Sequence, residues 1–190
     1  MMAKAAQLIR SGGIIVYPTE TVYGLGANAL DERAILRIFQ IKKRPLKMPV
    51  FLAVSSLEML QEVAEITDKD LDLLEKLFPG PISALVKKRN VVPNLLTAGS
   101  HLVGIRFPDH ETAIRIIDKS GPITSTSANE TGSMPPISAE EVSQRIRDKV
   151  DLVVDGGRSR YAQPSTLLDL SSRSIIRKGA GLDNVLKAIS

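Results

Sequence analysis

The chain has 190 residues, a formal net charge of +4, and ordinary shares of hydrophobic (43%) and charged (24%) side chains, which fit one globular domain. It has no cysteine, so disulfides, thiolate metal sites and cysteine nucleophiles are excluded. No apolar run reaches the roughly 20 residues that a membrane helix needs. Residues 1–10 also lack the apolar core of a signal peptide. We therefore expect a cytoplasmic protein without membrane contact.

Apolar runs alternate with stretches of helical period, the pattern of an α/β sheet covered by helices. Helices are predicted over residues 1–10, 31–41, 56–66, 68–78, 110–119, 138–149 and from 182 onward. Strands are predicted over 14–17, 50–54, 82–87, 102–107, 123–126, 152–154, 166–170 and 174–177. Because some strands adjoin other strands, the sheet should mix parallel and antiparallel pairs within a single domain over residues 1–190.

Two helix starts have capping signals. Asp31 is a favoured N-cap for the second predicted helix. Ser138 and Glu141 have the spacing of a capping box, which would open a helix that runs to Lys149.

A polar loop follows the first predicted strand. Residues 19–21 lie at its carboxyl end, where open α/β sheets bind ligands. Gly24 and Gly26 would permit a tight turn or a close backbone approach. With Ala29, they match the dinucleotide fingerprint G-x-G-x-x-A. That fingerprint needs an acidic residue roughly 20 positions on, where this chain has a basic run, so a nicotinamide site is not expected.

Three further segments could bind anions. Residues 42–47 contain four cations in a segment stiffened by Pro45 and Pro49, which suits phosphates but also suits the C-terminus of a helix. Residues 125–129 are small and polar and follow a short strand, as in a nucleotide loop or a plain turn. Arg106 and Arg177 each lie in an apolar strand, where a charge needs an ion pair or a bound anion.

The sequence lacks the motifs of several common enzyme classes. The chain has no G-x-x-x-x-G-K-[ST] phosphate loop and no G-x-S-x-G nucleophile elbow. Aromatic residues make up only 4% of it, which argues against RNA reading by base stacking.

Together these segments resemble the YrdC family, also called TsaC. The motifs occur in the family's order over essentially the whole chain. They are Tyr-Pro-Thr-Glu-Thr-Val-Tyr-Gly-Leu-Gly from Tyr17, Lys-x-Arg-Pro from Lys42, Pro-Gly-Pro from Pro79, Val-Gly-Ile-Arg-Phe-Pro from Val103, Ser-Thr-Ser-Ala-Asn from Ser125, Pro-Ser-Thr from Pro164 and Ile-Arg-Lys-Gly-Ala from Ile176. Each motif is short, but their order is specific.

The resemblance implies a twisted mixed α/β sheet around a basic concave cavity. It also implies a threonylcarbamoyl-AMP synthase, which converts L-threonine, bicarbonate and ATP to threonylcarbamoyl-AMP and pyrophosphate. A separate transferase would then modify tRNA with this product. Mg²⁺ would accompany the ATP. A single YrdC-like domain without the C-terminal extension of longer members is expected.

The family's residue roles carry over to matching positions. Lys42 and Arg44 would be the catalytic pair that holds the triphosphate, and Arg106 would receive the threonine carboxylate. The threonine side would comprise Thr21, Arg106, Ser125 and Thr166, the last together with or in place of Ser165. The nucleotide side would comprise Lys42, Arg44, Met48, Ser127, Asn129 and Arg177. Metal ligands are not expected.

The chain departs from the family at Ala53, where many members carry a histidine beside the threonine pocket. Lys43 also replaces the small residue often found within Lys-x-Arg. Two other functions stay open. A double-stranded RNA or tRNA binding module would need only phosphate contacts. Carbamoyl adenylation, as in the related domain of HypF, would use carbamoyl phosphate, but the flanking regions expected there are missing.

Overall fold

The structure is a computed structural model that describes residues 1–189, so Ser190, the last residue of the predicted domain, lies outside it. The helices are α1 (Met2–Arg10), α2 (Glu32–Lys42), α3 (Leu57–Val63), α4 (Asp68–Leu77), α5 (Glu111–Ser120), α6 (Gln144–Arg147) and α7 (Leu182–Ile189). The strands are β1 (Ile15–Tyr17), β2 (Gly24–Gly26), β3 (Phe51–Ala53), β4 (Ala64–Glu65), β5 (Ile82–Lys88), β6 (Leu102–Arg106), β7 (Ile123–Ser127), β8 (Leu152–Val153), β9 (Thr166–Asp169) and β10 (Ser174–Arg177).

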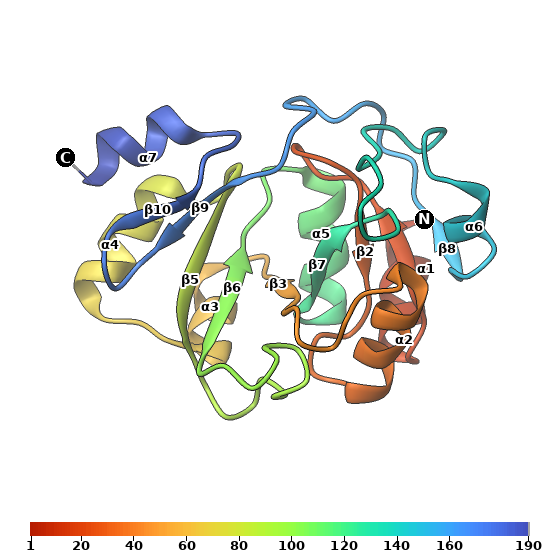
Figure 1. Cartoon of the computed structure of the whole chain (residues 1–190), viewed down its shortest axis with the longest axis horizontal. Coiled ribbons are helices and arrows are strands. Elements are labelled where there is room, and N and C mark those ends of the chain that lie inside the picture. The colour runs from red at the N-terminus through yellow and green to blue at the C-terminus, as the bar shows by residue number, and fades with distance from the viewer. Residues whose placement is uncertain (190) are drawn as a thin grey trace.

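The strands form one sheet in the order β10-β9-β5-β6-β3-β7-β2-β1-β8, and β4 pairs with β5 (Figure 1). The pairs β1/β8, β3/β6 and β5/β9 are parallel. The remaining pairs are antiparallel. The predicted mixed α/β sheet is therefore confirmed.

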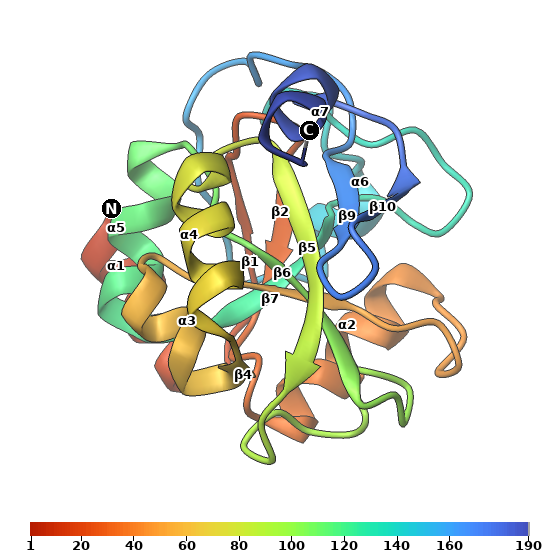
Figure 2. The same cartoon turned by 90° about the vertical axis from the view of Figure 1, so that its left-hand side faces the viewer.

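Helices cover both faces of the sheet. Figure 2 shows α1, α3, α4 and α5 on one side and α2 on the other. Helix α1 packs against α5, and α4 packs against α7. Buried apolar side chains between these layers form the core. No helix within residues 1–189 is long and apolar enough to cross a bilayer.

Helix α2 begins and ends as its sequence indicates. The Asp31 carboxylate accepts a hydrogen bond from the Arg33 amide at 2.9 Å, which confirms the predicted N-cap. The helix ends at Lys43, which adopts a left-handed conformation with φ 51°. This residue turns the chain sharply between the two cations on either side of it.

The predicted helix over residues 138–149 is wrong. Only Gln144–Arg147 is helical. In a capping box, Glu141 would accept a hydrogen bond from the Ser138 amide. Its carboxylate instead accepts one from the Ile137 amide at 2.9 Å, which holds residues 137–141 in a turn.

Gly24 and Gly26 lie in strand β2, so of the two alternatives left open by the sequence, a tight turn does not apply. Strand β2 pairs with β1, and Tyr17 lies opposite Gly24. A Cβ atom at Gly24 would lie 2.8 Å from Cε1 of the buried Tyr17 ring. Glycine is therefore required because the ring covers the strand's backbone.

Gly24→Ala is expected to lower the free energy of unfolding by about 1–3 kcal/mol, since the fully packed tyrosine ring would have to move. Because the chain has no tryptophan, urea unfolding followed by circular dichroism would measure the loss. The same substitution in a Tyr17→Ala background should cost much less. An equal cost in both backgrounds would contradict the assigned contact.

Candidate functional site

A cavity of about 220 Å³, open to solvent, lies at the ends of several strands. Its walls come from the β1–β2 loop, the start of β3, strand β7 and the segments around Ser83, Ser165 and Arg177. Among residues 1–189, the lining contains three arginines, Arg44, Arg106 and Arg177, and no carboxylate. Such a surface favours an anionic ligand.

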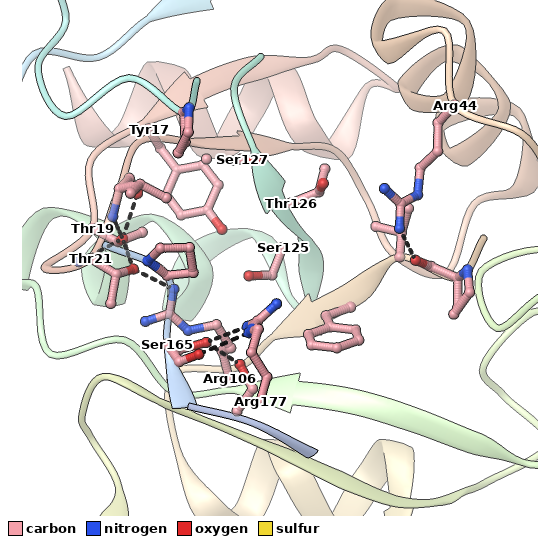
Figure 3. Close-up of a pocket in the computed structure, with 18 residues that line it drawn as sticks. Tyr17, Thr19, Thr21, Arg44, Arg106, Ser125, Thr126, Ser127, Ser165 and Arg177 are labelled. Carbon is pink, nitrogen blue, oxygen red and sulfur yellow. Dashed lines mark hydrogen bonds between the residues drawn. The ribbon is translucent and has the colours of Figure 1, made fainter. Parts of the chain in front are cut away.

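The cavity brings together most of the predicted site residues (Figure 3). Those that line it are Thr21, Arg44, Arg106, Ser125, Ser127, Ser165 and Arg177. Lys42, Met48, Asn129 and Thr166 are not part of the lining formed by residues 1–189. Figure 3 places Arg106, Arg177 and Thr21 at one end and Arg44 at the other, with Ser125 between them.

Arg106 projects from the end of β6 and is held by the β1–β2 loop. Its guanidinium donates to Thr21 Oγ1 at 2.8 Å and to Glu20 Oε1 at 2.5 Å. Arg106 is 7% exposed and Glu20 is 2% exposed. The loop is itself fixed, because Ser159 donates to the Thr19 carbonyl and the Tyr161 amide donates to the Glu20 carbonyl, both at 2.8 Å.

Arg177 lies near Arg106 and is oriented by Ser165. Its guanidinium donates to the Ser165 carbonyl and to the Ser165 hydroxyl, both at 3.1 Å. The same hydroxyl lies 2.7 Å from Ser83 Oγ. Burial, and to a lesser extent the charge of Arg106, lower the pKa of Arg177. Two cations thus converge on one end of the cavity.

Glu20 is the functional residue that sequence reasoning missed. Its position in the Thr-Glu-Thr run was visible, but the run does not reveal that its carboxylate is buried against Arg106. Burial raises the pKa of Glu20, and the charge of Arg106 partly offsets that rise. One carboxylate against two guanidinium groups leaves a single positive charge at this end. A ligand with one carboxylate would neutralise it.

Arg44 forms the opposite end of the cavity. Its guanidinium donates to the carbonyls of Met48 at 3.0 Å and Pro49 at 2.8 Å. These bonds fix the turn over residues 44–49 and the direction of the side chain. Burial lowers the pKa of Arg44, so the cation would gain from an anionic partner.

The other predicted site residues lie around the cavity. Lys42 is buried beneath residues 127–131 and donates to their carbonyls. Asn129 donates to the Ser133 carbonyl at 2.6 Å. Thr166 is buried and donates to the Gly179 carbonyl at 3.0 Å. Met48 is 37% exposed on the turn after α2. Their predicted ligand contacts remain predictions.

Two aromatic rings line the cavity, and neither was predicted as part of the site. Tyr17 is buried, and burial raises its pKa to about 12, so its hydroxyl stays neutral. Phe51 lies against Gly104, where a Cβ atom would clash with the ring at 2.2 Å. Ala53, where many family members carry a histidine, is buried and pairs in register with Arg106 on β6.

The chain offers no built metal site in its described part. Among residues 1–189, no group of three or more histidine, aspartate or glutamate side chains could hold a metal ion. A metal at this cavity would need ligands from a bound substrate, because the lining supplies only hydroxyl groups and arginines as its polar side chains.

The chain is similar to known proteins over most of its length. Residues 7–179 match the Sua5/YciO/YrdC family model, which carries the description "Telomere recombination". Threonylcarbamoyl-AMP synthase of Pyrococcus abyssi is 42% identical over 169 residues, which cover 88% of this chain and 50% of that protein. Threonylcarbamoyl-AMP synthase of Pseudomonas syringae is 34% identical over 177 residues, covering 93% of this chain and 96% of the relative. The chain thus spans about half the length of the first relative and nearly all of the second.

Solved structures agree with these matches. P. abyssi Sua5 complexed with L-threonine superimposes with a TM-score of 0.93 at 38% identity, covering 100% of this chain and 57% of that one. E. coli YciO gives a TM-score of 0.83 at 30% identity, covering 94% of this chain and 88% of that one. Full-length HypF, at 19% identity and a TM-score of 0.82, shares the fold. On the strength of the family model and these relatives, this chain belongs to the Sua5/YciO/YrdC family.

Proposed function

We propose that this chain is a threonylcarbamoyl-AMP synthase that uses L-threonine, bicarbonate and ATP. The observation that carries the proposal is that Arg106 and Arg177 lie at one end of the cavity, where the Glu20 carboxylate pairs with Arg106 and one positive charge is left for a carboxylate ligand. Relatives that carry this name, and the relative whose structure contains L-threonine, support it.

The amino acid would bind at the end formed by Thr21, Arg106 and Arg177. Its carboxylate would neutralise the two-arginine end, with Ser165 and Ser125 as further polar contacts. Ser165 is the better candidate than Thr166, because the Thr166 hydroxyl is already bonded to Gly179. Arg177 lies at this end rather than beside Arg44, which favours a contact with the amino acid over one with the nucleotide (Figure 3).

The reaction brings two anions together. The neutral amine of threonine attacks the carbon of bicarbonate-derived CO₂, loses a proton and becomes an N-carboxylate. An oxygen of this carboxylate then attacks the α-phosphorus of ATP, the bond from that phosphorus to the bridging oxygen breaks, and pyrophosphate leaves with the electron pair. Arg44 would neutralise the triphosphate from the opposite end of the cavity, so that the two reactants align between the arginines.

Mg²⁺ would be carried by the phosphates of ATP, since the described part of the chain supplies no carboxylate to the cavity lining. The product would pass to a separate transferase that modifies tRNA. We propose that the chain acts in the cytoplasm, where ATP, bicarbonate and unmodified tRNA are available.

The decisive experiment measures pyrophosphate release from ATP and bicarbonate, with and without L-threonine. We expect release that depends on L-threonine and is much lower with L-serine, which lacks one methyl group. A folded protein with no threonine-dependent release in the presence of Mg²⁺ would refute the proposal. Release that requires carbamoyl phosphate would favour the HypF-like reaction, and salt-sensitive RNA binding that ignores threonine would favour a binding module.

A further inference from the structure

Lys42 occupies an unusual position for a predicted phosphate-binding residue. It is the last residue of α2 and is 2% exposed. Its ammonium group donates to the carbonyl of Asn129 at 2.7 Å and to the carbonyl of Ser127. Its own carbonyl accepts a hydrogen bond from the Thr131 amide at 2.9 Å. The residue thus contacts residues 127–131, called here the β7 loop, through both its side chain and its main chain.

The side-chain bonds do not depend on a nearby negative charge. Lys42 forms none of the ion pairs found between residues 1 and 189. Burial, together with the charge of Arg44, lowers the pKa of Lys42 to about 7. A neutral amine still carries two N–H groups, so either protonation state can donate to both carbonyls. The anchor should therefore hold across the pH range near neutrality.

The β7 loop is the segment that gives Ser127 to the cavity. The loop has other contacts as well: the Ala128 amide donates to the Tyr23 carbonyl at 2.8 Å, and Glu130 pairs with Lys43 at 3.0 Å and with Arg145 at 3.6 Å. Without Lys42, two loop carbonyls would lose a charge-assisted donor in a buried place. Arg44, two residues later, points into the cavity instead.

We propose that Lys42 is a positioning residue that fixes the β7 loop, and with it Ser127, against the end of α2. It acts through the loop rather than by direct contact with a phosphate, while Arg44 makes the contact. The assignment of the loop to the nucleotide rests on the proposed function. The anchoring itself does not.

Hydrogen exchange on the intact chain without substrates tests the anchoring. In Lys42→Met, amide exchange in a peptide spanning residues 127–133 should accelerate by about tenfold or more, because two loop carbonyls lose their hydrogen bonds from the Lys42 side chain. Lys47→Met, on the exposed turn after α2, is the matched control and should leave that peptide unchanged. Arg44→Met should also leave it unchanged, although it would loosen residues 44–49.

Steady-state kinetics separate positioning from a purely structural role. Lys42→Met should raise the KM for ATP about tenfold or more while the KM for L-threonine stays within about twofold. Should Lys42→Met fail to fold, Thr131→Pro removes the loop's main-chain bond and should give a smaller change in the same direction in both readouts. Unchanged exchange in the loop of a folded Lys42→Met protein, or of Thr131→Pro in its place, would overturn the proposal. A chain without adenylating activity would still show the exchange result, so the two proposals can fail separately.

Discussion

Arg106→Met should abolish threonine-dependent pyrophosphate release and should also destabilise the fold. The loss of activity should be about 100-fold or more, because the amino-acid end of the cavity would lose one of its two cations and its bond to Thr21. The free energy of unfolding should fall by about 3–5 kcal/mol, because the substitution leaves the Glu20 carboxylate buried without its partner. Urea unfolding and a pyrophosphate assay measure the two effects.

A second substitution separates these effects. In Arg106→Met with Glu20→Gln, no unpaired charge remains in the buried site, so most of the lost stability should return. Activity should stay lost, because the cation that would hold the carboxylate is still missing. If the double variant regained activity, Arg106 would serve the fold alone. If the single variant kept both its stability and its KM for L-threonine, the ion pair would have no role in the site.

The ion pair of Glu20 and Arg106 predicts how the free energy of unfolding depends on pH. Burial raises the pKa of Glu20 above its ordinary value, so the folded state holds the proton more strongly than the unfolded chain does. Stability contributed by such a group is lost as the pH rises through the folded pKa. Removing Arg106 should raise the pKa of Glu20 further, because the charge of Arg106 lowers it, and should so make the stability depend more strongly on pH. The destabilisation of Arg106→Met should therefore shrink when the pH is lowered from about 8 to about 5.

The general design of the fold was predictable from the sequence. Periodicity and the Asp31 cap located the long helices, and adjacent strands implied a mixed sheet. The family resemblance implied that Thr21, Arg106 and Ser125 share one site, and all three line one cavity, since polar residues at strand ends meet at one region of a sheet. These features depend on local pattern and on rules of sheet geometry.

Other features depend on contacts between distant segments and were not predictable. Gly24 indicated a turn, but a tyrosine ring from the neighbouring strand requires glycine there within a strand. Glu20 and Arg106 are 86 residues apart in the chain and meet only after the sheet has formed. The spacing of Ser138 and Glu141 fits a capping box, but the glutamate carboxylate accepts its hydrogen bond from the Ile137 amide instead.

The Lys-x-Arg motif shows how one local conformation divides neighbouring residues between two roles. Lys43 adopts a left-handed conformation that ends α2, so Lys42 is the last residue of the helix and Arg44 lies beyond its end. Lys42 therefore points beneath the β7 loop while Arg44 reaches the cavity. From sequence alone, both cations were expected to hold the same triphosphate, since the motif does not encode the backbone conformation between them.

Arg44→Ala should reduce turnover by about 100-fold while the fold survives. The guanidinium lines the cavity at the end opposite Arg106 and Arg177, and residues 1–189 supply no other cation to the lining there (Figure 3). The loss of stability should be only about 1 kcal/mol, because the bonds to the carbonyls of Met48 and Pro49 lie on a surface turn. Turnover is measured as threonine-dependent pyrophosphate release and stability by urea unfolding.

Arg44→Lys tests whether charge alone is sufficient. A lysine keeps the charge but lacks the fork that can hold two phosphate oxygens and also fix the turn. Its turnover should therefore lie between that of the native chain and that of Arg44→Ala, with a raised KM for ATP and an unchanged KM for L-threonine. Lys47→Ala, in the same basic run, is the control and should retain native turnover. Equal losses in Lys47→Ala and Arg44→Ala would mean that the run acts as a diffuse positive field, whereas native turnover in Arg44→Ala would remove Arg44 from the proposed site.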